Sequence, residues 1–538
     1  MTTRVLIIGG YGNFGGYIAR ALAHDRNIVL LIGGRSIDKA TAFAAGLAAA
    51  NPAEGHALDI DGDLGAAFAA IRPDLVIHTT GPFQRQDHRV ARAAIAAGVS
   101  YLDLADSRAF VARIGELDAA ARAAGVAVVT GASSVPCLTA ALIDRYRPAF
   151  GRLDSAIYGI AAAQQTNRGL GTAAAVLSYV GQPFTRLSEG RATRAFGWQG
   201  LHAVRYPELG TRLFGDCDIP DLDLFPARYP GLHDLRFVAG HEVKLLHLGT
   251  WALSWAVRAG LIRSLARYAP ALLKASFLFD PFGSGRSGLH MFLSGTDPAG
   301  APMTVRIFMV ARQAHGPNVP CIPAIILARR IAAGERLAPG ARPCLDLIDL
   351  DALLGALGDL DITTVAHGPG IDDRWPATDD RLSRAPDDRA RQHDAPGMSG
   401  IERARLILRW LLAAIYLLAG VLHVWAPAPF LGIVPGWVPF PDMVVLLTGL
   451  CEIAGAVGLM TRRWRWIAAV MLALYAVCVF PANIKHAIDG LVYGRNTLGW
   501  GYHAPRLLLQ PVIVWWSLFA GGVIDWPFRH RITIDRAS

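Results

Sequence analysis

Three glycines near the start of the chain have the spacing of a phosphate-binding turn. The run Gly10-Tyr11-Gly12-Asn13-Phe14-Gly15 follows the apolar stretch Val5–Ile8 and precedes an alanine-rich segment. Glycines in this pattern permit a tight turn and a close approach of backbone to a pyrophosphate, whose charge the N–H groups at the start of the next helix attract. The run therefore predicts a dinucleotide site; the alternative is a retained fold with an empty site.

The end of the second apolar stretch indicates which dinucleotide is preferred. A NAD-preferring domain usually offers an acidic residue to the ribose at this place, whereas this chain reads Gly33-Gly34-Arg35-Ser36. An arginine and a hydroxyl can hold a 2′-phosphate, so NADP is the predicted cofactor. The alternative for Arg35 is an exposed loop residue. Asp59 is expected either to contact the adenine or to cap the following helix.

Two further segments follow predicted strands at the same edge of a sheet. They are Gly81-Pro82-Phe83 and the segment from Tyr101 to Ser107. Because the carboxyl ends of parallel strands form the ligand crevice, both are expected beside the nicotinamide. Tyr101 and Asp103 are the candidate catalytic acid–base pair, with Asp106 and His241 as further candidates and a structural role as the alternative for each. No spacing of histidines, cysteines and carboxylates predicts a metal site.

A parallel sheet must position these residues. Over residues 4–130 short apolar stretches alternate with alanine-rich ones, which is the βαβ pattern of a doubly wound Rossmann domain, predicted for residues 1–135. The expected strands are Arg4–Ile8, Ile28–Ile32, Asp74–His78, Ser100–Leu104 and Val126–Thr130, and the expected helices are Asn13–Ala23, Ile37–Ala50, Asp87–Ala97 and Arg108–Ala124.

Residues 136–370 predict a second domain of the α+β class, inserted into the first sheet or following it. The expected strands are Ser155–Ala161, His241–Leu246, Gly288–Gly295 and Thr304–Val310, and the expected helices are Cys137–Arg147, Gly171–Tyr179 and Ile322–Ala333.

Together these motifs resemble the saccharopine dehydrogenase-like oxidoreductases. The glycine run, Gly81-Pro82-Phe83, the Tyr101 to Asp103 segment and Ser133-Ser134-Val135-Pro136 carry the resemblance, which covers roughly residues 1–360. It implies an NADP-binding Rossmann domain, an α/β second domain and hydride transfer with NADP(H). The chain reads Ala132-Ser133-Ser134 where relatives often carry Phe-Asp-Ser, and so lacks a carboxylate beside the site.

Composition points to a chain that is part soluble and part membrane-bound. Its 538 residues exceed one core, and 53% hydrophobic residues with 18% charged ones are too apolar for an ordinary soluble enzyme. The net charge of +9 comes from dispersed arginines, which argues against a nucleic-acid partner. The scattered cysteines predict reduced thiols. Residues 371–400, rich in Asp, Arg and Pro, predict a disordered linker.

The C-terminal region, residues 401–530, predicts a bundle of four transmembrane helices. The expected spans are Leu406–Trp425, Met443–Met460, Trp466–Ile484 and Leu507–Ile524, each near the roughly 20 residues that cross a bilayer. Arginines before the first span, between the second and third, and after the fourth predict that both termini are cytoplasmic. With no signal peptide at the N-terminus, the expected location is the cytoplasmic membrane.

This region resembles the DoxX-like four-span membrane proteins, some of which are linked to quinone-dependent sulfur oxidation. The resemblance rests on Gly420-Val421-Leu422-His423, the segment Ile433–Pro439, Glu452 and Phe480-Pro481-Ala482-Asn483. An ionisable side chain inside an apolar helix is a functional candidate, so His423, Glu452 and Asn483 are expected to line one polar pocket. The alternative is a polar cluster that only ties the helices together.

These inferences predict a membrane-tethered, NADP-dependent oxidoreductase acting on a small or membrane-soluble substrate, with a quinone among the candidates and the bilayer as partner. Two alternatives stay open. One is a non-catalytic nucleotide-sensing or structural membrane protein, and the other is a fusion of two independent activities.

Overall fold

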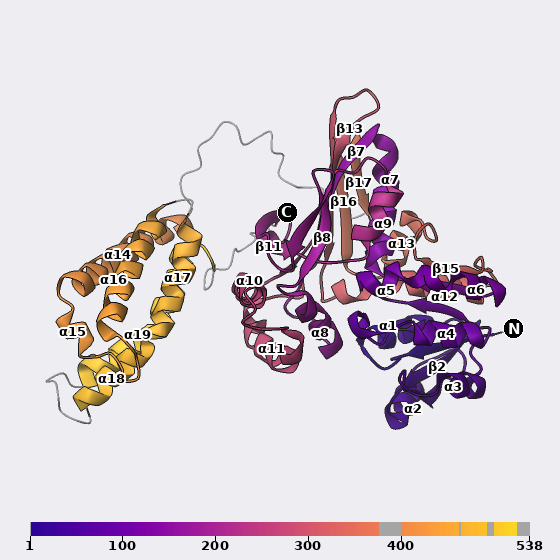
Figure 1. Ribbon diagram of the computed structural model, residues 1–538, viewed down its shortest axis with the longest axis horizontal. Coiled ribbons are helices and arrows are strands. Elements are labelled where there is room, and N and C mark those ends of the chain that lie inside the picture. The colour runs from indigo at the N-terminus through magenta and orange to yellow at the C-terminus, as the bar shows by residue number, and fades with distance from the viewer. Residues whose placement is uncertain (1, 376–399, 462–463, 492–499, 525–538) are drawn as a thin grey trace, which may run out of the picture. The chain divides into compact units, whose positions relative to one another are not determined.

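The computed structural model describes residues 2–375, 400–461, 464–491 and 500–524. The chain separates into two compact units, Met1–Ser383 and Arg384–Ser538 (Figure 1). The first unit contains two sheets, and the second is helical.

The first sheet carries the glycine turn. Its seven strands pair in parallel in the order β15-β6-β5-β4-β1-β2-β3, so β1 to β6 have the strand order of a Rossmann fold. The predicted doubly wound parallel sheet is confirmed. The strands are β1 (Thr3–Ile8), β2 (Ile28–Gly34), β3 (Glu54–Ala57), β4 (Leu75–His78), β5 (Ser100–Asp103), β6 (Ala127–Thr130) and β15 (Gly340–Pro343).

Both faces of this sheet are buried. Along β1, Val5 and Ile7 belong to one hydrophobic cluster while Leu6 and Ile8 belong to another, because successive side chains of a strand point to opposite faces. The covering helices are α1 (Asn13–Leu22), α2 (Ile37–Ala45), α3 (Leu64–Ile71), α4 (Arg89–Ala96), α5 (Arg108–Ala112), α6 (Asp118–Ala123) and α12 (Ile322–Ala332). The helix expected over Arg108–Ala124 is divided into α5 and α6 by a 3₁₀ turn, Ile114–Leu117.

The chain returns to the first sheet after building the second domain. Strand β15 lies outside the range 1–135 predicted for the Rossmann domain, and it extends that sheet beside β6. Helix α12 packs on α1, and Arg329 donates a hydrogen bond of 2.8 Å to the Ala21 carbonyl. The second domain is therefore an insertion in the first.

The second sheet is mixed and has eight strands in the order β10-β11-β12-β7-β13-β14-β16-β17. Strands β12 and β7 are parallel and the other pairs are antiparallel. The strands are β7 (Arg152–Ala162), β10 (His202–Tyr206), β11 (Gly210–Asp216), β12 (Asp234–His241), β13 (Ser287–Thr296), β14 (Pro302–Ala311), β16 (Ile362–Gly368) and β17 (Ile371–Trp375), and β8 (Pro183–Ser188) with β9 (Arg191–Phe196) forms a separate hairpin.

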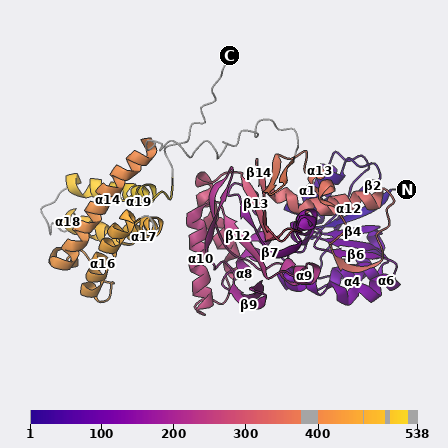
Figure 2. The same ribbon diagram turned by 90° about the horizontal axis from the view of Figure 1, so that it is seen from above.

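Helices flank this second sheet (Figure 2). They are α7 (Thr139–Tyr146), α8 (Leu170–Tyr179), α9 (Asp221–Arg228), α10 (Lys244–Arg258), α11 (Ala269–Ser276) and α13 (Leu350–Ala356). The strand expected at His241–Leu246 is wrong, because β12 ends at His241 and α10 begins at Lys244. Strand β17 lies in the range predicted as linker, and the rest of that range, residues 376–399, lies outside the described residues.

The second unit consists of helices packed around small and apolar side chains such as Ala456, Leu459 and Ala469. Its helices are α14 (Gly400–Trp425), α15 (Ala428–Leu431), α16 (Pro441–Met460), α17 (Arg465–Cys478), α18 (Phe480–Leu491) and α19 (Trp500–Ala520).

Three helical segments of the described residues are long and apolar enough to cross a membrane: Arg405–Trp425, Pro441–Met460 and Arg465–Asp489. The prediction of four spans is therefore corrected to three candidate spans among the described residues. Helix α19 ends at Ala520, four residues before the end of the fourth expected span. Every stretch of 18 residues within this helix therefore includes His503 and Arg506, which lower its hydropathy. An odd number of spans puts the two ends of a bundle on opposite sides, so the orientation remains a prediction.

Candidate functional site

The glycine turn has the geometry that its sequence predicts. The N–H of Gly12 donates to the Gly9 carbonyl at 2.9 Å, and α1 begins directly after Gly12. A Cβ atom on Gly15 would collide with the Gly9 carbonyl and lie 2.7 Å from the Thr79 hydroxyl. Close packing thus excludes any side chain at Gly15, and it leaves the first N–H groups of α1 at the turn.

The other residues of the run take three different positions. The Tyr11 ring covers Gly34, where an added Cβ would collide with the ring, and the Tyr11 hydroxyl accepts a hydrogen bond of 3.2 Å from the Ser36 N–H. Asn13 pairs with Asn167 of the second domain, whose amide donates to its carbonyl at 2.8 Å. Phe14 points into a cavity described below. The run therefore also joins the two domains.

A positively charged side chain directly follows β2. Arg35 is exposed and makes no hydrogen bond or ion pair to any described residue. The Ser36 hydroxyl accepts from the Lys39 N–H at 3.3 Å and caps α2. The hydrogen of the Ser36 hydroxyl is still available for donation. Arg35 and Ser36 can therefore bind a phosphate without breaking an internal ion pair.

Asp59 is exposed, and its carboxylate accepts from the Asp61 N–H at 3.1 Å. Helix α3 is capped instead by Asp63, which accepts from the Ala66 N–H at 2.9 Å. The alternative that Asp59 caps this helix is wrong, and its carboxylate faces solvent near the end of β3.

The residues of the loop after β4 differ in burial. Gly81 is exposed and Pro82 is half-buried. Phe83 is buried, with its ring 5.3 Å from the Phe110 ring and 5.1 Å from the His78 ring. Phe83 therefore supports the loop from inside, and only the glycine and proline lie where a ligand can touch them.

Tyr101 and Asp103 are fully buried. The Tyr101 hydroxyl lies 3.0 Å from His78 Nδ1, and Asp103 Oδ1 accepts from the Thr130 hydroxyl and the Gly131 N–H, both at 2.8 Å. Burial raises the pKa of Asp103 to about 6, although these hydrogen bonds oppose the shift. Both side chains tie strands together, and this burial argues against the prediction that they are catalytic.

An apolar cavity of about 470 Å³ lies where the two domains of the first unit meet. Phe14 and Ser134 line it from the nucleotide-binding side. Its second-domain walls come from β7, α8, α10, α11 and β13, with apolar side chains that include Ile160, Val176, Leu253, Leu272 and Leu289. A cavity of this size and polarity fits a small ligand.

His241 is a titratable side chain in the cavity wall. Its ring stacks on Trp198 at 4.6 Å, and its Nε2 lies 3.4 Å from the Thr250 hydroxyl. Burial, and then the charge of Arg168, lowers the pKa of His241 to about 4. The imidazole is therefore neutral near pH 7 and can accept a hydrogen bond or a proton from a ligand.

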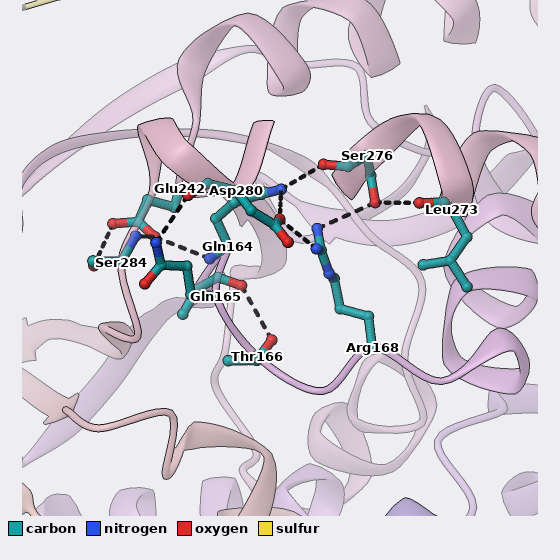
Figure 3. A network of polar contacts seen from close by, with 10 residues as sticks. Gln164, Gln165, Thr166, Arg168, Glu242, Leu273, Ser276, Asp280 and Ser284 are labelled. Atoms are coloured by element: carbon teal, nitrogen blue, oxygen red, sulfur yellow. Dashed lines mark hydrogen bonds and ion pairs between the residues drawn. The ribbon is translucent and has the colours of Figure 1, made fainter. Parts of the chain in front are cut away.

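A polar network fixes one rim of the cavity (Figure 3). Arg168 is ion-paired with Asp280 and donates to the Ser276 hydroxyl at 3.1 Å. Glu242 accepts from the N–H groups of Gln164 and Ser284 at 2.9 and 2.8 Å. These residues could not be found from the sequence, because they come from distant segments without a shared local pattern.

The predicted polar pocket of the helical unit is only partly assembled. His423 Nδ1 and Glu452 Oε2 lie 2.8 Å apart, joining α14 to α16. Asn483 instead donates to Gln510 Oε1 at 3.0 Å. Thus the structure brings together two of the three predicted residues and pairs the third with α19.

Each of the two units contains a region that matches a known protein family. Residues 5–129 match the saccharopine dehydrogenase NADP binding domain. Residues 412–520 match a domain of unknown function, DUF8561, so the resemblance to DoxX-like proteins is not shown. Among curated proteins, none matches this sequence.

Solved structures with a similar fold include three oxidoreductases at low similarity. Saccharopine dehydrogenase (L-Glu forming) from Saccharomyces cerevisiae has a TM-score of 0.48 and 14% identity over 68% of this chain and 100% of its own. Amine dehydrogenase from Mycobacterium smegmatis has a TM-score of 0.34 and 13% identity over 63% of this chain and 94% of its own. Biliverdin reductase from Synechocystis, solved with biliverdin and NADP+, has a TM-score of 0.32 and 14% identity over 66% of this chain and 96% of its own. These values carry no argument about substrate.

The NADP binding domain presents polar groups suited to a nicotinamide dinucleotide. Its glycine turn packs tightly at Gly15 and leaves the first N–H groups of α1 at the turn, and Arg35 is an unpaired cation among the described residues. Both features suit a phosphate-bearing ligand lying across the carboxyl ends of β1 and β2. The residues present therefore fit the cofactor.

Proposed function

We propose that this protein is a membrane-tethered, NADP-dependent oxidoreductase that acts on a small or lipophilic carbonyl, imine or quinone-like substrate. One observation carries the proposal: Phe14 belongs to the glycine turn and also lines the apolar cavity. A dinucleotide held by that turn has the cavity beside it.

The glycine turn and the loops after the neighbouring strands each bind a different part of the cofactor. The run Gly10–Gly15 holds the pyrophosphate at the start of α1, Arg35 and Ser36 bind the 2′-phosphate, and Asp59 lies on the adenine side. Gly81 and Pro82 border the nicotinamide. The bound cofactor supplies or accepts the hydride.

The cavity selects an apolar substrate and excludes water from it. Its walls are mostly aliphatic and aromatic, so a lipophilic ligand gains about 25 cal/mol for each Å² of apolar surface that it buries. His241, held by Trp198 and Thr250, takes up the proton of the reacting hydroxyl or amine as the hydride leaves for the cofactor, and the resulting imidazolium returns this proton in the reducing direction.

The membrane unit raises the local concentration of a substrate dissolved in the bilayer. Its three apolar segments support an attachment to the cytoplasmic membrane, with the first unit on the cytoplasmic side, where NADPH is available. The pair His423 and Glu452 is an ionisable group inside this bundle and is the candidate for handling a polar or quinone-like headgroup.

The cofactor assignment is tested by titrating the full chain with NADPH and with NADH while following cofactor fluorescence. We expect NADPH to bind at least tenfold more tightly, and Arg35→Ala to remove this preference while leaving NADH binding unchanged. The matched control is Arg92→Ala, since Arg92 is exposed on α4, away from the turn. Absence of binding by either nucleotide would overturn the oxidoreductase proposal.

A second candidate function is nucleotide sensing without turnover. The burial of Tyr101 and Asp103 favours it, because the chain then lacks the predicted acid–base pair. His241→Gln separates the two candidates in an assay of NADPH oxidation with a panel of long-chain aldehydes and quinones. The enzyme proposal expects turnover that falls at least a hundredfold in the variant with unchanged NADPH affinity. Sensing expects no turnover in either protein.

A further inference from the structure

Exposed apolar side chains gather in one part of the first unit. Nine large apolar side chains of residues 2–375 are exposed, and six of them lie within 28 residues of sequence. These six, here called the aromatic face, are Trp255, Leu261, Tyr268, Phe277, Leu278 and Phe282. Leu261 is 80% exposed, Leu278 74% and Phe282 68%. Isolated exposed apolar residues are ordinary, but such a concentration marks a contact surface.

The same segment is strongly basic. Residues 244–286 contain six Lys or Arg residues and one acidic residue, Asp280, whose charge is already paired with Arg168. Arg263, Arg267 and Lys274 are exposed. The surroundings of the aromatic face therefore carry a net positive charge that complements an anionic partner.

These helices also form a wall of the apolar cavity. Leu253 of α10 and Leu272 of α11 pack in one hydrophobic cluster with Val176 of α8, and all three line the cavity. On the segment after α11, Phe279 lines the cavity while its neighbour Leu278 is exposed. Close neighbours in this segment thus line the cavity in some cases and are exposed in others.

We propose that the aromatic face docks on the anionic surface of a lipid bilayer, and that a lipophilic substrate passes from the bilayer to the cavity through this helical wall. The docking stands on the exposed side chains and the charge alone. The passage of substrate rests on the proposed oxidoreductase function.

A lipid surface explains the combination of side chains better than a protein partner does. Tryptophan, tyrosine, phenylalanine and leucine beside lysine and arginine are typical of segments that lie in the bilayer interface. Arginine stacks on two of the aromatic rings, with Arg258 4.9 Å from the Trp255 ring and Arg267 5.1 Å from the Tyr268 ring. The charged groups thereby lie beside the apolar groups, as lipid headgroups lie beside acyl chains.

The proposal is tested by photocrosslinking in the full chain. Leu278 is replaced by p-benzoylphenylalanine, the protein is reconstituted into vesicles of phosphatidylcholine with 30% phosphatidylglycerol, and lipid adducts on that peptide are measured by mass spectrometry after illumination. The matched control places the same residue at Ile37, which is 46% exposed in the same unit. We expect at least five times more lipid adduct at position 278 than at position 37.

Charge dependence provides the second readout. Vesicles of phosphatidylcholine alone, and the triple variant Arg263→Glu, Arg267→Glu, Lys274→Glu, should each lower the adduct at position 278 at least threefold. NADPH titration of the triple variant checks its fold and reports on the cofactor site separately, so that loss of docking and loss of the proposed function are distinguishable. Equal adducts at both positions, or crosslinks from position 278 to a second copy of the chain or another protein segment, would overturn the proposal.

Discussion

Gly15 and Gly16 lie side by side at the start of α1 but face different surroundings. A Cβ on Gly15 would lie 2.7 Å from the Thr79 hydroxyl and 2.9 Å from the Gly10 Cα, whereas a Cβ on Gly16 would meet the Phe43 ring at 3.4 Å. Only Gly15 lets the turn pack closely against Thr79, which follows β4. A substitution at Gly15 therefore tests the phosphate-binding turn, and one at Gly16 tests ordinary helix packing.

We therefore expect Gly15→Ala to weaken NADPH binding at least tenfold, because the turn must open to admit the methyl group, and to destabilise the protein by about 1–3 kcal/mol through overpacking. Gly16→Ala, the control, should change NADPH affinity less than twofold. Both effects are read by nucleotide titration and thermal unfolding of the full chain. Equal losses in the two variants would count against the assignment of the turn.

The residues that could be predicted from sequence were those whose signal is local. The glycine run and the Arg35-Ser36 pair lie at the places that their spacing indicates, directly after β1 and β2. The rim of the cavity could not be predicted, since Arg168 meets Asp280 across more than a hundred residues of sequence. For Tyr101 and Asp103 the sequence could not separate a catalytic role from a structural one, because polar side chains at a strand end can equally tie strands together inside the core.

At the scale of elements, buried strands were predicted best. Continuous apolar runs such as Arg4–Ile8 mark strands buried on both faces, and β1 differs from its expected range by one residue. The run His241–Leu246 was too short to distinguish a strand from a helix. Over a longer range, Leu246, Thr250, Leu253 and Val257 recur at helical spacing, and α10 turns these residues towards the cavity and the core.

Strand β13 carries a buried histidine that makes the first unit sensitive to acid. His290 is fully buried, its Nδ1 lies 2.8 Å from the Tyr206 hydroxyl, and burial lowers its pKa to about 3. The unfolded chain binds this proton near pH 6.5 and the folded chain does not. The contribution of His290 to stability is therefore present above pH 6.5 and is lost as the pH falls towards 3.

His290→Phe should make the free energy of unfolding less dependent on pH. Between pH 6.5 and pH 5 the loss should be smaller than in the parent protein by about 2 kcal/mol, since each pH unit in this window is worth about 1.4 kcal/mol per buried histidine. Denaturant unfolding at several pH values measures this slope. The exposed His24 provides the control, His24→Ala, which should keep the parental slope; a parental slope in His290→Phe would contradict the assignment.

At the scale of the whole molecule, the division into two units could be predicted and the number of spans could not. Composition separates a soluble part from an apolar one, and each unit of the structure has its own hydrophobic cluster. Span counting failed at α19, where apolar stretches are mixed with prolines, histidine and arginine. The choice between an inserted and a following second domain was also beyond reach, because β15 is too short to have a signal of its own.

Because each unit has its own core, cutting between them should leave nucleotide binding intact. A protease site inserted between Trp375 and Gly400 permits the cut in the reconstituted protein. We expect the released first unit to bind NADPH within twofold of the uncut chain, and to leave anionic vesicles only when salt is added, since docking by the basic segment is electrostatic. Aggregation of the fragment, or loss of its NADPH affinity, would mean that the units depend on each other.

The central claim is that the glycine turn holds a nicotinamide cofactor facing the apolar cavity. The most direct measurement is a structure of the full chain determined with NADPH bound. We predict density for the pyrophosphate at the start of α1, the 2′-phosphate beside Arg35, and the nicotinamide at the mouth of the cavity near Phe14. An empty turn, or a nicotinamide that lies away from the cavity, would contradict the account.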